Sequence, residues 1–182
     1  MTEEIRQRYR RVSSVISPFT DFSNIDASVL KNAADRGTRV HKYCELYTKG
    51  LLGIEPEEDA KPYVESFIKW FDRMVQEVLY IEKRLYCDEY MLTGQIDLIV
   101  KMAEPEPWII DIKTPQQESK TWRLQTAGYL HLANKMEPNT YNRACLQLDK
   151  NGGVPHLKVY PHHGKDMSLF FDALRLVEFF RM

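Results

Sequence analysis

The chain has 182 residues, of which 43% are hydrophobic and 28% are charged, a balance that fits one ordinary globular domain with a sizeable core. Its formal net charge of −1 excludes a general attraction to nucleic acid, so contact with nucleic acid would depend on local basic patches. No apolar run of about 18 residues indicates a membrane span, and the charged N-terminus does not have the pattern of a secretory signal. The cysteines form no pair suited to a disulfide framework or a zinc site, and they fit a reducing cytoplasm; they are Cys44, Cys87 and Cys145.

Two helices are expected in the N-terminal part of the chain. Residues 26–49 carry apolar side chains at spacings of three and four, with an interruption near Gly37 and a stop at Gly50 and Gly53. Residues 58–77 repeat this spacing with a strongly aromatic face. The side chains on that face are Tyr63, Phe67, Trp70, Phe71 and Met74.

Three strands are expected to follow. Residues 78–87 alternate between apolar and charged side chains, and residues 90–101 form a second run of strand-forming residues. The short connection between these runs favours a hairpin. After a proline-containing turn at residues 103–107, residues 108–113 read WIIDIK, a nearly all-apolar strand that belongs at the centre of a sheet.

The last part of the chain is expected to contain a helix, a second hairpin and a final helix. Residues 119–135 have a helical pattern that stops at a Glu-Pro-Asn sequence. Strands at 143–149 and 156–160 are joined through Asn-Gly-Gly, which favours a hairpin. Residues 165–181 form a helix that is apolar nearly all round, so it either seals the sheet within the monomer or is covered by another subunit.

This order of elements predicts an α/β (α+β) fold, in which a mixed sheet of about five strands lies between helical layers. Residues 1–182 are expected to form one domain. Within it we expect a helical part at about 1–77, a core at about 78–160 and a C-terminal helix at about 165–181.

Three charged residues stand out on the apolar strands. Asp111 and Lys113 are two residues apart, so both side chains leave the same face of their strand. Asp97 is another lone carboxylate among aliphatic residues, on the strand before. A short turn joins the two strands, so Asp97 and Asp111 are expected to lie side by side. Burying charged side chains in such strands costs free energy, so a functional role is one explanation for them. A surface ion pair remains the simpler alternative.

Two neighbouring carboxylates repel each other unless a proton or a cation lies between them. A divalent metal ion resolves this conflict, and oxygen ligands suit Mg²⁺ or Mn²⁺. Glu82, on the preceding strand, is a candidate third carboxylate, and an exposed position on a half-buried strand is an equal alternative. His41, on the first helix, is a candidate ligand that would favour Mn²⁺, whereas most lone helical histidines are structural.

The helix at 119–135 carries two polar residues on one face. Gln125 and Tyr129 are four apart and therefore neighbours on the helix surface. Two basic clusters are candidates for contact with nucleic acid, although such clusters are more often solvated faces. The first contains Arg6, Arg8, Arg10 and Arg11, and the second contains Lys113, Lys120 and Arg123.

In order and spacing, GTRVH at 37–41, Glu82, GQID at 94–97, DIK at 111–113 and QTAGY at 125–129 resemble the motifs of the PD-(D/E)XK nuclease superfamily. The resemblance covers about residues 12–149 and is greatest to the RecB-like branch, which includes phage and CRISPR-associated exonucleases. It implies a restriction-endonuclease-like core that would make residues 78–160 catalytic. It also implies a metal-dependent DNA nuclease, an exonuclease by its branch, in DNA recombination, repair or phage DNA processing.

The resemblance implies a role for each matching residue. Asp97 and Asp111 would be the acidic metal ligands, with His41 and the carbonyl of Ile112 completing the metal shell. Lys113 would be the catalytic lysine. Three more catalytic candidates are Glu82, Gln125 and Tyr129, and the residues expected to hold DNA are Arg10, Arg11, Lys120, Arg123, Gln125 and Tyr129.

The resemblance also sets expectations for cofactors and partners. Mg²⁺ or Mn²⁺ is expected, without an iron–sulfur cluster, because the cysteines do not match the cluster pattern of some relatives. No ATP is expected, because the sequence lacks GxxxxGK[ST]. The partners would be DNA ends, a recombination or helicase protein, or a second copy of the chain, in the cytoplasm of a bacterial or phage-infected cell. The alternatives are a structure-specific endonuclease or resolvase of the same fold, and an inert module that binds DNA or protein.

Overall fold

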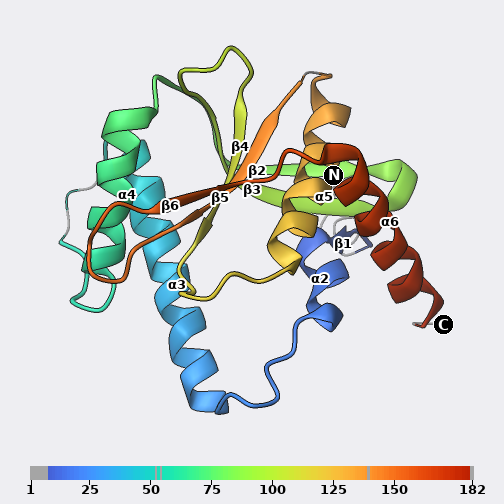
Figure 1. Ribbon diagram of the computed structural model, residues 1–182, viewed down its shortest axis with the longest axis horizontal. Coiled ribbons are helices and arrows are strands. Elements are labelled where there is room, and N and C mark those ends of the chain that lie inside the picture. The colour runs from blue at the N-terminus through green and yellow to red at the C-terminus, as the bar shows by residue number, and fades with distance from the viewer. Residues whose placement is uncertain (1–7, 52, 54, 139, 181–182) are drawn as a thin grey trace.

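In the computed structural model, a mixed β-sheet lies between two groups of helices (Figure 1). One face of the sheet packs against α3 (Ala27–Thr48) and α4 (Lys61–Met74). The other face packs against α2 (Val12–Ile16), α5 (Thr121–Met136) and α6 (His163–Phe179). The structure describes residues 8–51, 53, 55–138 and 140–180. The predicted α/β architecture is confirmed, and its elements surround the strands that carry the conspicuous aspartates.

Six strands form the sheet among the described residues: β1 (Arg10–Arg11), β2 (Glu77–Cys87), β3 (Leu92–Lys101), β4 (Trp108–Lys113), β5 (Asn142–Gln147) and β6 (His156–Val159). Their order is β1-β3-β4-β5-β6, and β2 also pairs with β3. The pairs β1–β3 and β4–β5 are parallel, and the other three are antiparallel. The mixed sheet and the central place of β4 are confirmed. The strand β1 was not predicted, because two residues are too few to leave an alternating pattern.

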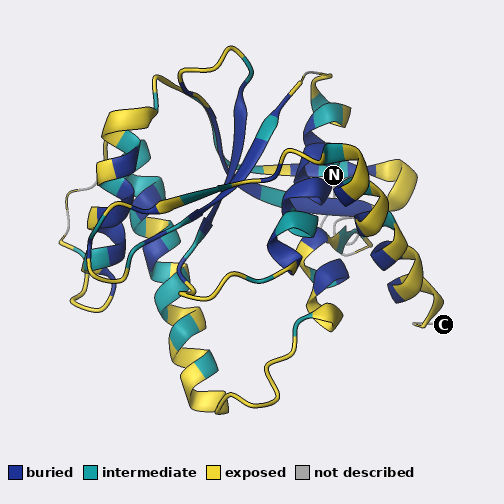
Figure 2. Cartoon of the chain, viewed as in Figure 1, coloured by how far each residue is buried: buried dark blue, intermediate teal, exposed yellow. Residues whose placement is uncertain are grey.

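The core consists of two main apolar clusters, one on each face of the sheet (Figure 2). In the first, Ile99 and Ile109 of the sheet pack against α2, α5 and α6. In the second, Leu98 and Ile110 pack against α3 and α4. Successive residues of a strand point to opposite faces, so the all-apolar strands β3 and β4 supply both clusters. A sheet covered on both faces leaves little room for charge at its centre.

The helix α3 is continuous through Gly37, so the predicted interruption is wrong. The side chain of Asp26 accepts a hydrogen bond from the N–H of Ser28 at 2.8 Å and caps its first turn. Gly50, with a φ of +67°, ends the helix in the left-handed conformation that glycine favours. A glycine inside a helix costs only about 1 kcal/mol, which the packing of α3 against α4 and the sheet outweighs.

Other predicted boundaries move by a few residues. The helix α4 is shorter than the predicted 58–77, because Pro62 lies in its first turn and β2 already begins at Glu77. The predicted hairpin of β2 and β3 is confirmed, and a 3-10 turn, η2 (Asp88–Tyr90), connects its strands. The second hairpin, β5 with β6, is also confirmed.

A buried ion pair joins β5 to α5 and α6. Arg143 and Asp166 are both fully buried and form this pair. Asp166 also accepts a hydrogen bond from Arg123 Nε at 2.8 Å. In addition, Arg143 donates to the carbonyl of Arg123 at 2.7 Å and to the hydroxyl of Thr126 at 2.9 Å. Since buried charges need partners, these contacts fix the part of α5 that carries Gln125.

Only one face of the helix α6 packs against the rest of the molecule. Phe170 and Leu174 are buried against α2 and α5, whereas Leu169, Leu176 and Phe179 are exposed. The predicted end of this helix at Arg181 lies outside the described residues. None of the helices in the described part of the chain is both long and apolar enough to span a membrane.

Gly128 lies where α5 closely approaches α2 and α6 and allows a test of the packing. A Cβ at Gly128 would lie 2.8 Å from Phe170 Cζ and 2.9 Å from Val12 Cγ1, so Gly128→Ala should destabilise the protein by roughly 1–3 kcal/mol. Gly164, in the first turn of α6, faces open space, and Gly164→Ala should be neutral or stabilise by up to about 1 kcal/mol. Urea unfolding of both variants checks this, and equal stabilities would contradict the packing described.

Candidate active site

Three carboxylates lie in a row across β2, β3 and β4. The residues on either side of Glu82 pair with the residues on either side of Asp97, which places these two side by side. The antiparallel pair of Leu98 with Ile110 continues in register to Asp97 and Asp111. The predicted neighbourhood of the two aspartates is therefore confirmed, at the buried centre of the sheet.

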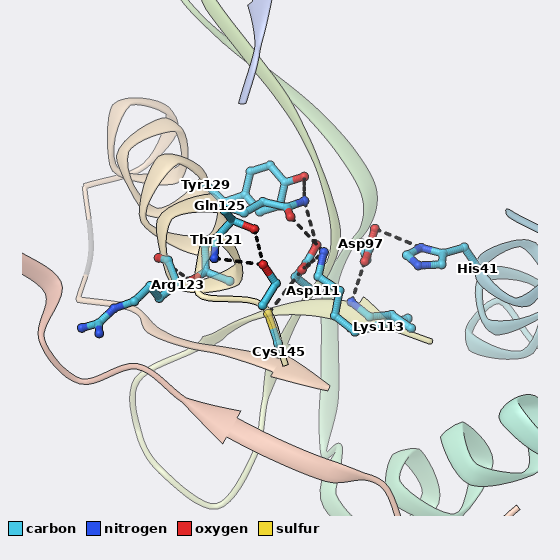
Figure 3. A network of polar contacts seen from close by, with 12 residues as sticks. His41, Asp97, Asp111, Lys113, Thr121, Arg123, Gln125, Tyr129 and Cys145 are labelled. Carbon is cyan, nitrogen blue, oxygen red and sulfur yellow. Dashed lines mark hydrogen bonds and ion pairs between the residues drawn. The ribbon is translucent and has the colours of Figure 1, made fainter. Parts of the chain in front are cut away.

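Asp97 is held from two sides (Figure 3). Its Oδ1 lies 3.4 Å from His41 Nδ1 of α3, and its Oδ2 accepts a 2.7 Å hydrogen bond from the backbone N–H of Ile112. Burial by itself raises the pKa of Asp97, but the charge of His41 and these hydrogen bonds outweigh burial and lower the pKa below its usual value. Burial likewise opposes protonation of His41, yet Asp97 raises the pKa of His41 to about 9. The pair is therefore ionic at neutral pH when no metal is bound.

Glu82 completes a group of three side chains that could bind a metal ion. One ligating atom from each of His41, Glu82 and Asp97 lies within 4.8 Å of the other two. Glu82 has a φ of +48°, a strained conformation of the kind that is often retained at functional sites. Burial and the charge of Asp97 raise the pKa of Glu82, while a hydrogen bond from Gln95 lowers it in part. Glu82 is thus half-buried beside Asp97 rather than fully exposed on its strand.

Asp111 forms a different set of contacts, toward α5 (Figure 3). Its Oδ2 forms an ion pair with Lys113 Nζ at 2.7 Å and accepts a hydrogen bond from Cys145 Sγ at 3.4 Å. Its Oδ1 accepts a hydrogen bond from Gln125 Nε2 at 3.3 Å. Burial raises the pKa of Asp111, and Lys113 offsets this only in part. Asp111 is therefore neutralised mainly by a lysine, whereas Asp97 is neutralised by a histidine.

Lys113 connects the carboxylates to α5. Its Nζ donates a 2.8 Å hydrogen bond to Gln125 Oε1, and Gln125 Nε2 donates to Tyr129 Oη at 2.9 Å. The predicted shared faces, of Asp111 with Lys113 and of Gln125 with Tyr129, are both confirmed. Burial lowers the pKa of Lys113, but the neighbouring Asp111, Cys145 and Asp97 together raise it by more, so the lysine stays charged. Gln125 thus holds a protonated ammonium group against the row of carboxylates.

The donor groups of this site fit a divalent cation. An imidazole and two carboxylates converge at His41, Glu82 and Asp97, and such a mixed set suits Mg²⁺ or, because of the imidazole, Mn²⁺. Asp111 is the next carboxylate in the row. The buried negative charge of Asp97 is compensated by His41 and a backbone N–H, and a metal ion would take the place of the proton on His41.

The predicted DNA-binding residues are spread over the surface around the site. Arg10 and Arg11 form β1 beside the first residues of β3, and Lys120 is exposed directly before α5. Arg123 forms an ion pair with Asp166 at 2.6 Å, and Figure 3 shows its guanidinium turned away from the carboxylates. Arg6 lies outside the described residues. A contact of these residues with DNA stays a prediction.

Three residues near the carboxylates were not recognised from the sequence. Gln95 contacts Glu82 and is two residues before Asp97. This spacing puts Gln95 and Asp97 on the same face of the strand, so Gln95 could have been identified from the sequence. Cys145 lies opposite Asp111 because β4 and β5 pair in parallel, a long-range register that no local pattern gives. The ring of Trp122 has its centre 5.8 Å from Lys113 Nζ, one turn before Gln125.

Comparisons with known proteins point to a family and to a fold. A sequence profile of the PD-(D/E)XK nuclease superfamily matches residues 63–175, which include the three carboxylates and Lys113 but not His41. No curated protein matches the sequence. A crystal structure of a protein from Eubacterium rectale, named "Putative exonuclease", has a TM-score of 0.57 and 9% identity, over 96% of this chain and 80% of its own. At that identity the likeness concerns the fold, which is restriction-endonuclease-like.

The pair of His41 and Asp97 predicts a pH-dependent stability of the metal-free protein. Folding raises the pKa of His41 from 6.5 to about 9, so the stabilisation is complete below pH 6.5 and is lost as the pH rises through about 9. We expect roughly 1–2 kcal/mol, because the side chain of His41 is 32% exposed and partly screened. Urea unfolding in EDTA should show the difference between wild type and His41→Gln shrinking between about pH 6 and pH 10. A difference independent of pH would rule out the ion pair.

Proposed function

Because the chain belongs to the PD-(D/E)XK nuclease superfamily, we propose that it is a metal-dependent deoxyribonuclease that hydrolyses phosphodiester bonds. The observation that carries this proposal is the meeting of the buried Asp97 and Asp111 with Lys113 and His41. Burying charged groups costs several kcal/mol each, and packing alone gives no reason to place two adjacent aspartates in the apolar centre of a sheet. The order of the motifs supports membership of the RecB-like branch.

We assign the metal site to His41, Glu82 and Asp97, with Asp111 and the carbonyl of Ile112 as further ligands. A bound Mg²⁺ or Mn²⁺ ion would lower the pKa of a bound water and neutralise charge on the scissile phosphate. His41 must lose its proton to become a ligand, and its raised pKa means that protons compete with metal at neutral pH. Glu82, held by Gln95, keeps a second carboxylate turned toward the same point.

Lys113 is the proposed catalytic cation. Its ammonium group lies between Asp111 and Gln125 and remains protonated. A charge fixed before the substrate arrives can orient the attacking water or stabilise negative charge that develops on the phosphate. Gln125 and Tyr129 act as positioning residues, because their hydrogen-bonded chain sets the direction of the lysine side chain.

We further propose that the substrate is DNA, held through its phosphates by Arg10, Arg11 and Lys120. Such contacts do not depend on sequence, and the net charge of −1 confines them to local patches. Arg123 would have to leave Asp166 to contribute. The proposed setting is the cytoplasm of a bacterial or phage-infected cell, where a recombination or helicase protein would supply unwinding.

Action at DNA ends is the form of this activity that we favour. The protein of similar fold named "Putative exonuclease" supports it, as does the resemblance to exonuclease motifs. Purified protein with Mn²⁺ should degrade linear DNA and leave a closed circle of the same sequence intact. Cutting of the closed circle would point to the endonuclease of the same fold.

Replacement of Lys113 tests the proposed chemistry. Lys113→Ala should reduce cleavage of linear DNA by about 100-fold or more, the usual effect of removing one preorganised charge at a reaction centre. The matched control is Lys135→Ala, which removes a surface lysine paired with Glu89 and should leave the rate unchanged. Initial rates of nucleotide release measure both. Equal rates for the Lys113 variant and wild type would refute the assignment of the lysine.

A further inference from the structure

An open cleft of about 850 Å³ adjoins Lys113, the ion-pair partner of Asp111. One wall is residues 17–25, which we call the aromatic strap, and the other is the connection from β4 to α5. In Figure 1 the strap leads from α2 to the start of α3, and the opposite wall follows β4. Lys113 and Gln125 line the inner end of the cleft. Anything that fills the cleft therefore reaches the proposed catalytic lysine.

The aromatic strap exposes large apolar side chains to this cleft. Phe19 is 48% exposed and Phe22 is 52% exposed, with Ile25 beside them. None of the three belongs to the core clusters, so they do not serve to fill the interior. Exposed aromatic side chains that gather in one cleft indicate a binding surface.

Local hydrogen bonds hold the strap in shape. The side chain of Asp21 accepts a bond from the N–H of Ser23 at 2.8 Å, and Asp26 caps α3. The hydroxyl of Thr20 lies 3.5 Å from that of Thr121 at the start of α5. The aromatic rings are therefore presented by a defined loop, so little conformational entropy is lost when a ligand binds.

The charges around the cleft are nearly balanced. Lys120 is cationic and Asp21 is anionic, Lys113 is paired with Asp111, and Glu118 forms an ion pair with Lys158 at 3.1 Å. A balanced cleft gives phosphates only a weak electrostatic attraction. Affinity in it must come mainly from the rings.

We propose that this cleft binds a single-stranded DNA end, with bases stacked on Phe19 and Phe22 and the backbone leading to Lys113. This inference rests on the proposed nuclease function and specifies its substrate. Aromatic rings bind bases of any sequence, because every base has a π-face. In a duplex the faces of all bases except those of the terminal pair are covered by their neighbours, so the strap can stack on successive bases only when these are unpaired. A cleft of about 850 Å³ has room for a few nucleotides of one strand.

Fluorescence anisotropy in EDTA, where no DNA is cut, tests the stacking. The probes are a labelled oligothymidylate, a strand of the same length and charge built from abasic sites, and a blunt duplex. Wild type should prefer the oligothymidylate to both others. Phe19→Ala and Phe22→Ala should each weaken that binding roughly 5- to 100-fold and leave binding of the abasic strand unchanged.

Two controls separate stacking from damage to the fold. Phe179→Ala removes a ring that is 64% exposed on α6, away from the cleft, and should bind as wild type does. Phe22→Tyr keeps a ring and should retain binding of oligothymidylate. Wild-type affinity in both alanine variants, or equal affinity of wild type for the abasic strand, would overturn the proposal; a protein or a second copy would then be the occupant to seek.

The same variants distinguish this inference from the proposed function. Methyl p-nitrophenyl phosphate, a minimal phosphodiester without a nucleobase, requires the catalytic groups but no strand in the cleft. Phe19→Ala and Phe22→Ala should hydrolyse it at the wild-type rate in Mn²⁺ and lose activity only on single strands. If wild type hydrolyses neither substrate but the two rings still determine the affinity for single strands, the proposed nuclease function is refuted and the proposed binding cleft is supported. If hydrolysis is normal and loss of the rings does not change the affinity for single strands, only the proposed binding cleft is refuted.

Discussion

Two aspartates side by side in the apolar centre of a sheet are the constraint on which the rest of the structure depends. Asp97 and Asp111 are almost fully buried, and neighbouring carboxylates cannot both stay charged without cations beside them. The cations come from two sides: His41 of α3 partners Asp97, and Lys113 partners Asp111 with the help of Gln125 from α5 (Figure 3). Helices on both sides of the sheet therefore contribute to the site, α3 through His41 and α5 through Gln125.

The site has two halves with different chemistry. On one side, His41, Glu82 and Asp97 form a compact group of donors suited to a metal ion. On the other, Lys113 is fixed by Asp111 and by α5. The buried ion pair of Arg143 with Asp166 also holds α5 in place. The position of Lys113 is therefore supported by contacts that involve three elements. The cleft opens onto this half, which is where a substrate strand would have to arrive.

Local patterns in the sequence predicted much of this arrangement. Alternation and runs of apolar, strand-forming residues placed the strands, the spacing of two put Asp111 and Lys113 on one face, and the spacing of four did the same for Gln125 and Tyr129. What depends on long-range contacts was not predictable. The ion pair of Arg123 with Asp166 forms only when α5 meets α6. The strained backbone of Glu82 likewise leaves no local pattern in the sequence. Gly37 was misread as a break, because tertiary packing overrides a local preference of about 1 kcal/mol.

The measurement that tests the account most directly is anomalous diffraction from crystals of the protein grown with Mn²⁺. The central claim is that Asp97, the middle carboxylate of the row that it forms with Glu82 and Asp111, is a ligand of the metal ion. It predicts a manganese peak within roughly 2.0–2.5 Å of an oxygen of Asp97, in contact with His41, Glu82 or both. Peaks confined to surface carboxylates, with His41 still paired to Asp97, would contradict it.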